Sequence, residues 1–221
     1  MAPVQALPWD ILLITDEQVP LGLVTSAAAA LDAGELHRRL ALQFRAKRSG
    51  REAQLRAAAH LRALTRKLGV PLLINADLDL AVAVEADGIH LPSRGVSPRD
   101  ARVALGAQAL IGRSCHSREE IKHESTFLDY ITLSPFFVVP GKGKPLARVY
   151  AKELIATART PVLALGGIGP AQAAEVLAMG ASGVAVIRSV LGAAQPATAL
   201  RALATAMDDA RMTGTTPLRA E

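Results

Sequence analysis

Basic and amide side chains occur in short groups along the chain, and each group directly follows a run of apolar residues. The segment LALQFRAK carries Gln43, Arg45 and Lys47 at alternate positions, which places them on one side of an extended chain. A second segment, LLINAD, contains Asn75, and a third, VVPGKGK, carries Lys142 between glycines. Because guanidinium, ammonium and amide groups are common partners of phosphate oxygens, these groups favour a ligand with one or two phosphates.

Two further segments suggest that backbone amide groups bind phosphate. LGGIGPAQ places Gly166 and Gly167 just before a helix that starts with proline, and AVIRSVLG places Ile187 and Arg188 at the start of another helix. Backbone N–H groups at a helix N-terminus bind phosphate, and glycine lets the oxygen atoms approach closely. The alternative is that both segments are tight strand-to-helix turns without a ligand.

The segment GRSCHS contains a candidate nucleophile and a candidate base, since Ser114, Cys115 and His116 are consecutive. Successive residues of a strand point to opposite sides, so Cys115 cannot form a direct nucleophile–base pair with either neighbour. His116 is a candidate general base because imidazole titrates near neutral pH. The alternative is a histidine that caps the following helix. His90 lies inside an apolar run and is predicted to be packed.

The elements that must position these groups alternate between short apolar runs and segments with helical periodicity. Runs that are apolar on both faces are typical of buried parallel strands. We predict strands at Ile11–Thr15, Leu40–Arg45, Pro71–Asn75, Gly88–Leu91, Ala109–Ser114, Tyr130–Ser134, Pro161–Leu165 and Gly183–Ile187. We predict helices at Arg51–Leu68, Leu78–Glu85, Ser97–Ala104, Arg118–Glu124, Arg148–Ala158 and Pro170–Met179.

Alternation of this kind predicts a parallel sheet with right-handed crossovers. The number and length of the repeats favour a single (βα)8 barrel, with an open doubly wound sheet as the alternative. In such a barrel the functional site lies at the C-terminal ends of the strands, where the groups described above fall. We expect an N-terminal extension over residues 1–10, the barrel over 11–210 and a disordered tail over 211–221.

Composition and charge limit the classes of partner. The 221 residues are 50% hydrophobic but only 3% aromatic, and the single cysteine excludes an internal disulfide and a cysteine-rich zinc site. The formal net charge is +5, but basic residues interleaved with stacking aromatics, as in nucleic-acid binding, are lacking. The most apolar stretch, 161–187, is interrupted by glycines, a proline and Glu175, and the start of the chain lacks the basic region of a signal peptide. We therefore expect a cytoplasmic protein that binds small phosphorylated substrates and neither nucleic acid nor membrane.

Six segments together resemble the thiamine phosphate synthase family in their order and spacing. They are LALQFRAK, PLLINADLDLAVAVEADGIHLPS, IGRSCHS, DYITLSPFF with GKGK, PVLALGGI and GASGVAVIRSV. The resemblance covers about residues 11–191, most of the chain. It implies a (βα)8 barrel, a homodimer, and an enzyme that joins an aminopyrimidine methyl diphosphate to a thiazole phosphate and releases pyrophosphate.

The resemblance also implies roles for the residues named above. The pyrimidine diphosphate would be held by Gln43, Arg45, Lys47 and Asn75. The thiazole phosphate would be held by Gly166, Gly167, Ile187 and Arg188, although the family usually has serine at the last of these positions. Ser114 would contact the substrate and Lys142 would reach the leaving pyrophosphate, so both are candidate catalytic residues together with His116.

The chain departs from the family at the positions that bind magnesium. The family's two metal carboxylates fall on Ala76 and Gly95. Asp77, one residue later, is a weak substitute because its side chain is expected to point away. We therefore expect no metal ligands in the chain itself, and Mg²⁺ to enter only through the substrate diphosphate. In the loop that carries Lys142, a pair of threonines is replaced by Val139 and Gly141.

Three functions stay open at this point. Related thiazole tautomerases (TenI-like proteins) share the barrel, but their general acid–base histidine falls on Pro135 of this chain. The retained Arg45, Lys47 and Lys142 favour the synthase, since a protein that binds only thiazole phosphate would have little use for them. A TenI-like tautomerase with His116 as its base, and a non-catalytic protein that binds thiazole or thiamine phosphate, are the alternatives.

Overall fold

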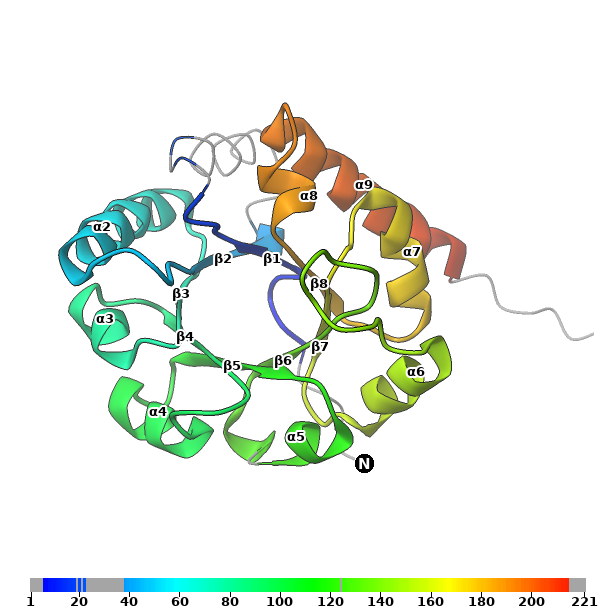
Figure 1. The fold of residues 1–221 in the computed structure, drawn as a ribbon, viewed down its shortest axis with the longest axis horizontal. Helices are drawn as coiled ribbons and strands as arrows, with labels where there is room; N and C mark the ends of the chain where they lie inside the picture. The colour runs from blue at the N-terminus through cyan, green and yellow to red at the C-terminus, as the bar shows by residue number, and fades with distance from the viewer. Residues whose placement is uncertain (1–5, 19, 21, 23–37, 124, 215–221) are drawn as a thin grey trace, which may run out of the picture.

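The computed structural model describes residues 6–18, 20, 22, 38–123 and 125–214. Eight parallel strands close into a barrel in the order in which they occur along the chain. Figure 1 looks along this barrel and shows the strands as an inner ring with the helices outside it. The predicted (βα)8 barrel is thereby confirmed, and the open sheet is excluded.

The strands are short, and their ends agree with the prediction to within one residue. They are β1 (Ile11–Ile14), β2 (Leu40–Phe44), β3 (Leu72–Asn75), β4 (Gly88–Leu91), β5 (Leu110–Cys115), β6 (Tyr130–Leu133), β7 (Val162–Leu165) and β8 (Gly183–Val186). β1 closes the ring because it pairs with both β2 and β8. Ile11 lies opposite Leu40 on one side and opposite Val184 on the other.

Helices form the outer layer. They are α2 (Arg51–Leu68), α3 (Leu78–Ala83), α4 (Pro98–Leu105), α5 (Arg118–Lys122), the 3-10 helix η2 (Ser125–Phe127), α6 (Arg148–Thr157), α7 (Pro170–Ala178), α8 (Arg188–Leu191) and α9 (Pro196–Gly214). α9 packs along α7 and α8 (Figure 1). It continues through residues 211–214, which the predicted boundary had assigned to the tail, and 215–221 lie outside the described residues. Within the described ranges, no helix combines the length and the apolar character needed to cross a membrane.

Local hydrogen bonds fix where helices begin. Ser97 Oγ accepts from the backbone N of Asp100 (3.0 Å) ahead of α4, and Ser117 Oγ accepts from the backbone N of Glu120 (3.3 Å) ahead of α5. Such caps satisfy amide groups that have no partner within the helix. The turn from each of these strands to its helix is therefore anchored, which gives the side chains at the strand ends a defined direction.

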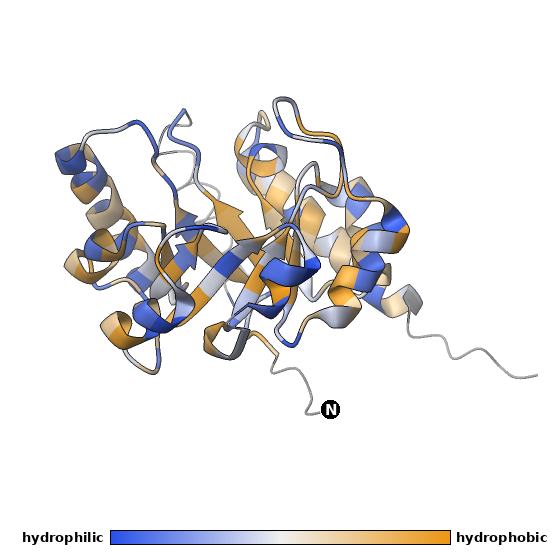
Figure 2. Ribbon diagram, turned by 60° about the horizontal axis from the view of Figure 1, so that its bottom comes forward, coloured by the Kyte–Doolittle hydropathy of each residue, from blue (hydrophilic) through white to orange (hydrophobic). Residues whose placement is uncertain are grey.

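The alternation of strand residues creates two separate cores. Outward-facing residues such as Leu42 and Ile74 are buried beneath the helices, whereas inward-facing residues such as Leu12, Leu73 and Leu163 fill the barrel. In Figure 2 the strands are largely hydrophobic and the hydrophilic residues lie mainly on helices and loops. This two-sided burial explains why the strands appear in the sequence as continuous apolar runs.

Tyr130 fills the barrel near the N-terminal ends of the strands. The ring of this fully buried residue lies edge-on to Trp9, with centroids 5.2 Å apart. It occupies the space beside Gly112, where a Cβ atom would come within 2.0 Å of Tyr130 Cζ. Just before β1, Asp10 pairs with Arg39 at 2.8 Å. The Tyr130 and Trp9 rings thus fill the interior of the barrel at the N-terminal ends of the strands.

We expect Gly112→Ala to lower the free energy of unfolding by about 1–3 kcal/mol, because the added methyl group overlaps the Tyr130 ring. Chemical denaturation measures the change. Gly143→Ala is the matched control, since a Cβ at that position meets no atom within 4 Å. Equal stability of the two variants would show that Tyr130 does not fill the barrel in this way.

Candidate functional site

Three cationic side chains gather at the C-terminal end of the barrel. Arg45 and Lys47 follow β2, and Lys142 comes from the loop after β6. The charge of Arg45 lowers the pKa of Lys47, and burial and Lys142 act in the same direction, so the three groups lie close together. None of them forms an ion pair within the described residues, in contrast to Arg62, which binds Asp87 at 2.6 Å. An unpaired cluster of like charges is unfavourable by itself and indicates a site for an anion.

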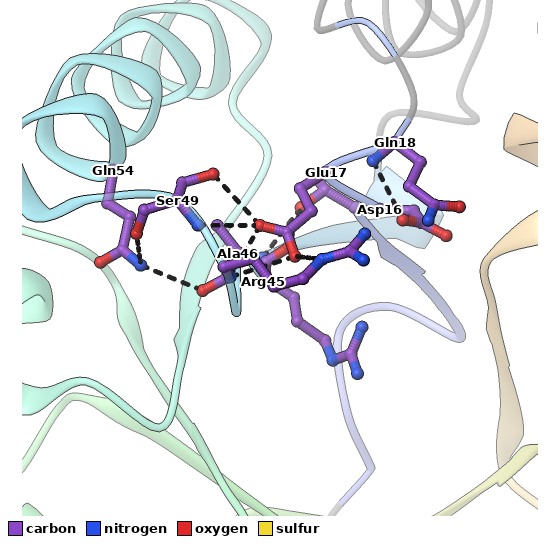
Figure 3. Close-up of polar contacts among 9 residues, drawn as sticks. Asp16, Glu17, Gln18, Arg45, Ala46, Ser49 and Gln54 are labelled. Atoms are coloured by element: carbon purple, nitrogen blue, oxygen red, sulfur yellow. Dashed lines mark hydrogen bonds and ion pairs between the residues drawn. The ribbon is translucent and has the colours of Figure 1, made fainter.

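The backbone that carries Arg45 is fixed by the residue that follows β1. Thr15 Oγ1 accepts a hydrogen bond from Arg45 N (2.8 Å) and donates one to Arg45 O (3.4 Å). From the other side, Gln54 of α2 donates through Nε2 to the carbonyl oxygens of Ala46 (3.2 Å) and Ser49 (2.9 Å). Figure 3 shows the Arg45 side chain extending away from these contacts. The cation is thus held on a loop that is anchored at both ends.

Glu17 is a second anchor for the same loop (Figure 3). Its carboxylate accepts hydrogen bonds from the backbone N of Arg48 (3.0 Å), the backbone N of Ser49 (3.2 Å) and Ser49 Oγ (3.1 Å). These bonds, with the Arg48 amide the largest cause, lower the pKa of Glu17 to about 2. The carboxylate therefore stays ionised at neutral pH and fixes the turn that follows Arg45 and Lys47.

A cavity of about 610 Å³ opens beside the cation cluster, between the ends of β2 and β3. Lys47 and Asn75 both line it, so the structure brings these two predicted residues together. Phe44 and Leu80 contribute apolar surface to the same cavity. Its volume lies within the range of small-molecule sites, and its lining combines apolar and polar side chains.

Asp77 lines this cavity too, but its carboxylate is already occupied. One oxygen accepts from the backbone N of Leu80 (2.8 Å) and caps α3, and the other pairs with Arg51. These contacts explain the residue structurally, because an acidic cap at a helix N-terminus is stabilising. Its value as a replacement for a metal ligand stays a prediction.

The residues at the family's two metal positions do not fit a magnesium site. Neither Ala76 nor Gly95 has a side-chain oxygen, and Mg²⁺ is bound by oxygen ligands, usually carboxylates. Within the ranges that the structure describes, no group of three or more His, Cys, Asp or Glu side chains is placed to share a metal ion. Neither position can therefore supply a magnesium ligand through its side chain.

Ala76 has an unusual backbone conformation, with φ of 65°. The backbone N of Asp77 donates to the carbonyl oxygen of Asn75 (2.9 Å), so these three residues form a γ-turn with positive φ. A second bond, from Ala76 N to the carbonyl oxygen of His90 (2.9 Å), ties the turn to β4. This conformation is strained for alanine, and such strain is concentrated at functional sites.

Gly166 and Gly167, at the end of β7, are required by packing. Their φ values are 107° and 69°. A Cβ on Gly167 would lie 2.8 Å from Phe137 Cβ, and one on Gly166 would lie 3.0 Å from Pro135 Cα. The loop after β6, which also carries Lys142, packs directly on these glycines. Packing alone is thus sufficient to explain both residues, and phosphate binding there stays a prediction.

Arg188 begins α8 directly after Ile187, and its side chain is exposed. Its Nε lies 3.5 Å from an oxygen of Asp16, which comes soon after β1. Because the guanidinium is exposed and the distance is long, this ion pair contributes little. The predicted positions after β8 therefore lie next to the segment that anchors Arg45, on the same end of the barrel.

Polar side chains also continue inside the barrel, below this surface. His90 Nδ1 lies 2.9 Å from Tyr130 Oη, while His90 Nε2 lies 3.0 Å from Ser114 Oγ and 3.4 Å from Thr132 Oγ1. Burial lowers the pKa of His90 to about 3, so the imidazole is neutral. Gln43 is also buried, and its Nε2 completes no hydrogen bond within the described residues. His90 is buried in the barrel, as predicted, and the Ser114 side chain forms a hydrogen bond with it.

His116 lies at the exposed end of the barrel, between β5 and β6. Its Nδ1 donates to the carbonyl oxygen of Ser134 (2.9 Å), so in the neutral ring Nε2 is the acceptor nitrogen. Cys115 belongs to the core beneath the helices, and burial raises the pKa of its thiol to about 12. A buried thiol with a raised pKa is protonated at neutral pH.

Two residues that support the candidate site, Glu17 and Tyr130, were not identified from the sequence. Glu17 stands in a short polar stretch after β1 whose spacing indicates no structure, and nothing in the sequence links it to Arg48. Tyr130 offered a weak signal, since it is one of only two tyrosines and begins a strand. Its contact with His90 depends on the alignment of strands that are 40 residues apart in sequence.

Comparison with protein families matches residues 11–190 to the family described as thiamine monophosphate synthase. That range spans the barrel from β1 to α8. The chain belongs to this family. Its membership confirms the resemblance from which the roles of the candidate residues were inferred.

Named relatives and a solved structure agree with this assignment. A thiamine-phosphate synthase from Xanthobacter autotrophicus is 34% identical over 92% of this chain and 99% of its own length. A protein named thiamine biosynthesis bifunctional protein ThiM/ThiE, from Symbiobacterium thermophilum, is 43% identical over 73% of this chain, which spans only 35% of that longer protein. The structure of thiamine phosphate pyrophosphorylase from Pyrococcus furiosus aligns with a TM-score of 0.79 and 26% identity, over 92% of this chain and 97% of its own.

We expect Glu17→Gln to destabilise the protein at neutral pH, and the difference from the native chain to shrink as the pH falls. A carboxyl whose pKa is lowered by folding stabilises the folded state above its ordinary value of 4.5, and this contribution is lost as the pH falls toward about 2. Urea denaturation at a series of pH values measures the effect. Glu153→Gln, in the exposed face of α6, is the control, and a pH dependence equal in both variants would contradict the role of Glu17.

Proposed function

We propose that this chain is a thiamine phosphate synthase, which joins an aminopyrimidine methyl diphosphate to a thiazole phosphate and releases pyrophosphate. The observation that carries the proposal is the unpaired cluster of Arg45, Lys47 and Lys142 at the open end of a barrel of this family. Full-length relatives that are named thiamine-phosphate synthase support it. A diphosphate is the part of either substrate whose charge best matches three cations.

In this proposal the cations stabilise the leaving group. When the bond between the pyrimidine methyl carbon and the diphosphate oxygen breaks, negative charge grows on the departing pyrophosphate. Cations that are already in place lower the free energy of that transition state, because no reorganisation is needed. Arg45 and Lys47 act from the anchored loop after β2, and Lys142 acts from the loop after β6. Asn75 binds the same substrate through its amide from the wall of the neighbouring cavity.

The thiazole phosphate is assigned to the ends of β7 and β8. Gly166, Gly167 and Ile187 supply backbone, and Arg188 supplies a guanidinium in place of the serine that is usual in the family. A guanidinium can bind two phosphate oxygens at once, so this replacement preserves phosphate binding. Gln43 is buried in the barrel, and its amide is assigned to the pyrimidine substrate.

A thiazole tautomerase is the second candidate, and His116 is the observation that favours it. The hydrogen bond to the Ser134 carbonyl holds the imidazole at the end of β6, one residue before Pro135. Nε2 is left as a proton acceptor at an exposed position. A base at this place could move the proton that a thiazole tautomer must lose to become aromatic.

Two assays on the purified protein separate these functions. The first supplies both substrates and measures thiamine phosphate across a magnesium titration, and the second supplies the thiazole tautomer alone and follows aromatisation. Formation of thiamine phosphate supports the synthase, and turnover in the second assay alone supports the tautomerase. If neither assay shows turnover and calorimetry shows that thiamine phosphate binds, both enzymatic functions are overturned and the chain is a binding protein.

We expect Arg45→Ala and Lys142→Ala each to lower kcat/KM for synthesis about tenfold to a hundredfold, since a hydrogen bond to a charged group contributes about 1.5–3 kcal/mol. Steady-state kinetics with the aminopyrimidine diphosphate as the varied substrate measures the loss. Lys152→Ala, on the exposed side of α6, is the control of equal charge. If all three variants kept the native kcat/KM, the cation cluster would have no part in the reaction.

We expect Ala76→Asp to make pyrophosphate binding more dependent on magnesium than it is in the native chain, because it restores a carboxylate beside Asn75. Calorimetry with and without Mg²⁺ measures the difference. Ala76→Asn is the matched control, since it has similar shape and tolerance of positive φ but no charge. The second metal position is less suitable for this test because Gly95 has φ of 131°, where other residues are strained. An Ala76→Asp protein with unchanged magnesium dependence would point to the loop at Val139 and Gly141 instead.

The family resemblance also leads us to propose a homodimer that works in the cytoplasm. Analytical ultracentrifugation measures the oligomeric state, and a sedimentation coefficient of a 23.1 kDa monomer at all concentrations would contradict the dimer. Fractionation of cells that express the natural gene tests the location.

A further inference from the structure

A buried hydroxyl group determines which nitrogen of His90 carries the proton. Tyr130 is fully buried, and its Oη has one hydrogen-bond acceptor within the described residues, His90 Nδ1 at 2.9 Å. Burial raises the pKa of Tyr130, and the nearby Gln43 side chain lowers it by a smaller amount. Gln43 Nε2 completes no hydrogen bond within the described residues, so it does not take the place of His90 as a partner. A buried hydroxyl that donates to nothing is costly, so Tyr130 donates its proton to Nδ1.

The neutral state of His90 then places a proton on Nε2. In a neutral imidazole one nitrogen carries hydrogen and the other accepts. Because Nδ1 accepts from Tyr130, Nε2–H is the donor. Its nearest partner is Ser114 Oγ at 3.0 Å, with Thr132 Oγ1 farther away at 3.4 Å.

Ser114 receives this hydrogen bond and keeps its own proton for another partner. Its side chain lies on the inner face of β5, near the open end of the barrel, and His90 is its one hydrogen-bond partner within the described residues. A serine activated as a nucleophile gives its proton to a base. Here the histidine donates instead, so the serine acts as a directed hydrogen-bond donor.

We propose that Tyr130 and His90 are positioning residues that orient the hydroxyl of Ser114 as a donor to an anionic oxygen of the bound substrate. The identity of that substrate rests on the proposed synthase function, whereas the direction of the hydrogen bonds does not. The chain of donors runs from Tyr130 through His90 to Ser114 and ends at the ligand. No proton is transferred along it, because the imidazole stays neutral.

The direction of the chain is tested by ¹⁵N NMR of the native protein labelled at histidine. Chemical shifts and coupling to hydrogen distinguish a protonated ring nitrogen from an unprotonated one, and His90→Gln identifies the signals among the five histidines. We expect Nε2 protonated and Nδ1 unprotonated, with no titration between about pH 5 and pH 8. A proton on Nδ1, or a titration in that range, would overturn the proposal whatever reaction the protein catalyses.

The functional consequence is tested by a double-mutant cycle. We expect Tyr130→Phe and Ser114→Ala each to lower kcat/KM for synthesis about tenfold or more, although the tyrosine hydroxyl is buried below the site. Because both act through one hydroxyl group, the double variant should be no slower than Ser114→Ala alone. Effects that simply multiply would show that Tyr130 acts independently of Ser114.

Matched variants separate positioning from a loss of structure. Tyr150→Phe changes the chain's other tyrosine, on α6, and should leave kcat/KM unchanged. His90→Gln keeps an amide donor near the position of Nε2 and should retain more activity than His90→Leu, while both are compared by thermal unfolding. If the protein proves to have no synthase activity, the same cycle is measured as the affinity for inorganic pyrophosphate. If His90→Gln and His90→Leu were equally stable and lost the same share of kcat/KM, the positioning role would be overturned.

Discussion

The whole site depends on the alternation of inward and outward side chains around a closed ring of strands. On β5 the inward positions hold Gly112, which leaves room for the Tyr130 ring, and Ser114, which reaches the open end. On β4 the inward position holds His90, which lies opposite Gly112 in the register of the two strands and bonds to Ser114. A shift of one residue in any of these strands would turn the polar groups toward the helices and the apolar groups inward. Barrel closure, which pairs both edges of the sheet, prevents such a shift.

A cluster of cations opposes folding unless something else holds the loops that carry it. Arg45, Lys47 and Lys142 repel one another, and within the described residues no carboxylate pairs with them. Hydrogen bonds to the backbone around the cluster offset this repulsion. Thr15 and Glu17, both after β1, bind the segment that follows β2 through main-chain groups, so the cations are held without being neutralised. That separation keeps the positive charge available for a ligand.

Local patterns in the sequence were sufficient to predict the barrel, and they were sufficient to find most of the candidate residues. Apolar runs placed every strand to within one residue. The predicted starts of α4 and α5 were also close to the observed ones, and the caps at Ser97 and Ser117 that fix them depend on neighbours in the chain. Contacts between distant segments could not be predicted in this way. The bond from Glu17 to Ser49 spans 32 residues, and the bond from His90 to Tyr130 spans 40. Both depend on which strands are neighbours and on their register, which only the folded chain defines.

The turn at Ala76 connects the altered metal position to the rest of the fold. Its positive φ is the conformation that glycine, asparagine and aspartate tolerate better than alanine does. The strain, of the order of 1–3 kcal/mol for such a residue, is maintained because Ala76 N binds the His90 carbonyl and Asp77 caps α3. These bonds hold Asn75 at the edge of the cavity that Lys47 also lines. The chain therefore keeps the backbone of a turn suited to a carboxylate while lacking the carboxylate itself, and what the turn still positions is the amide of Asn75.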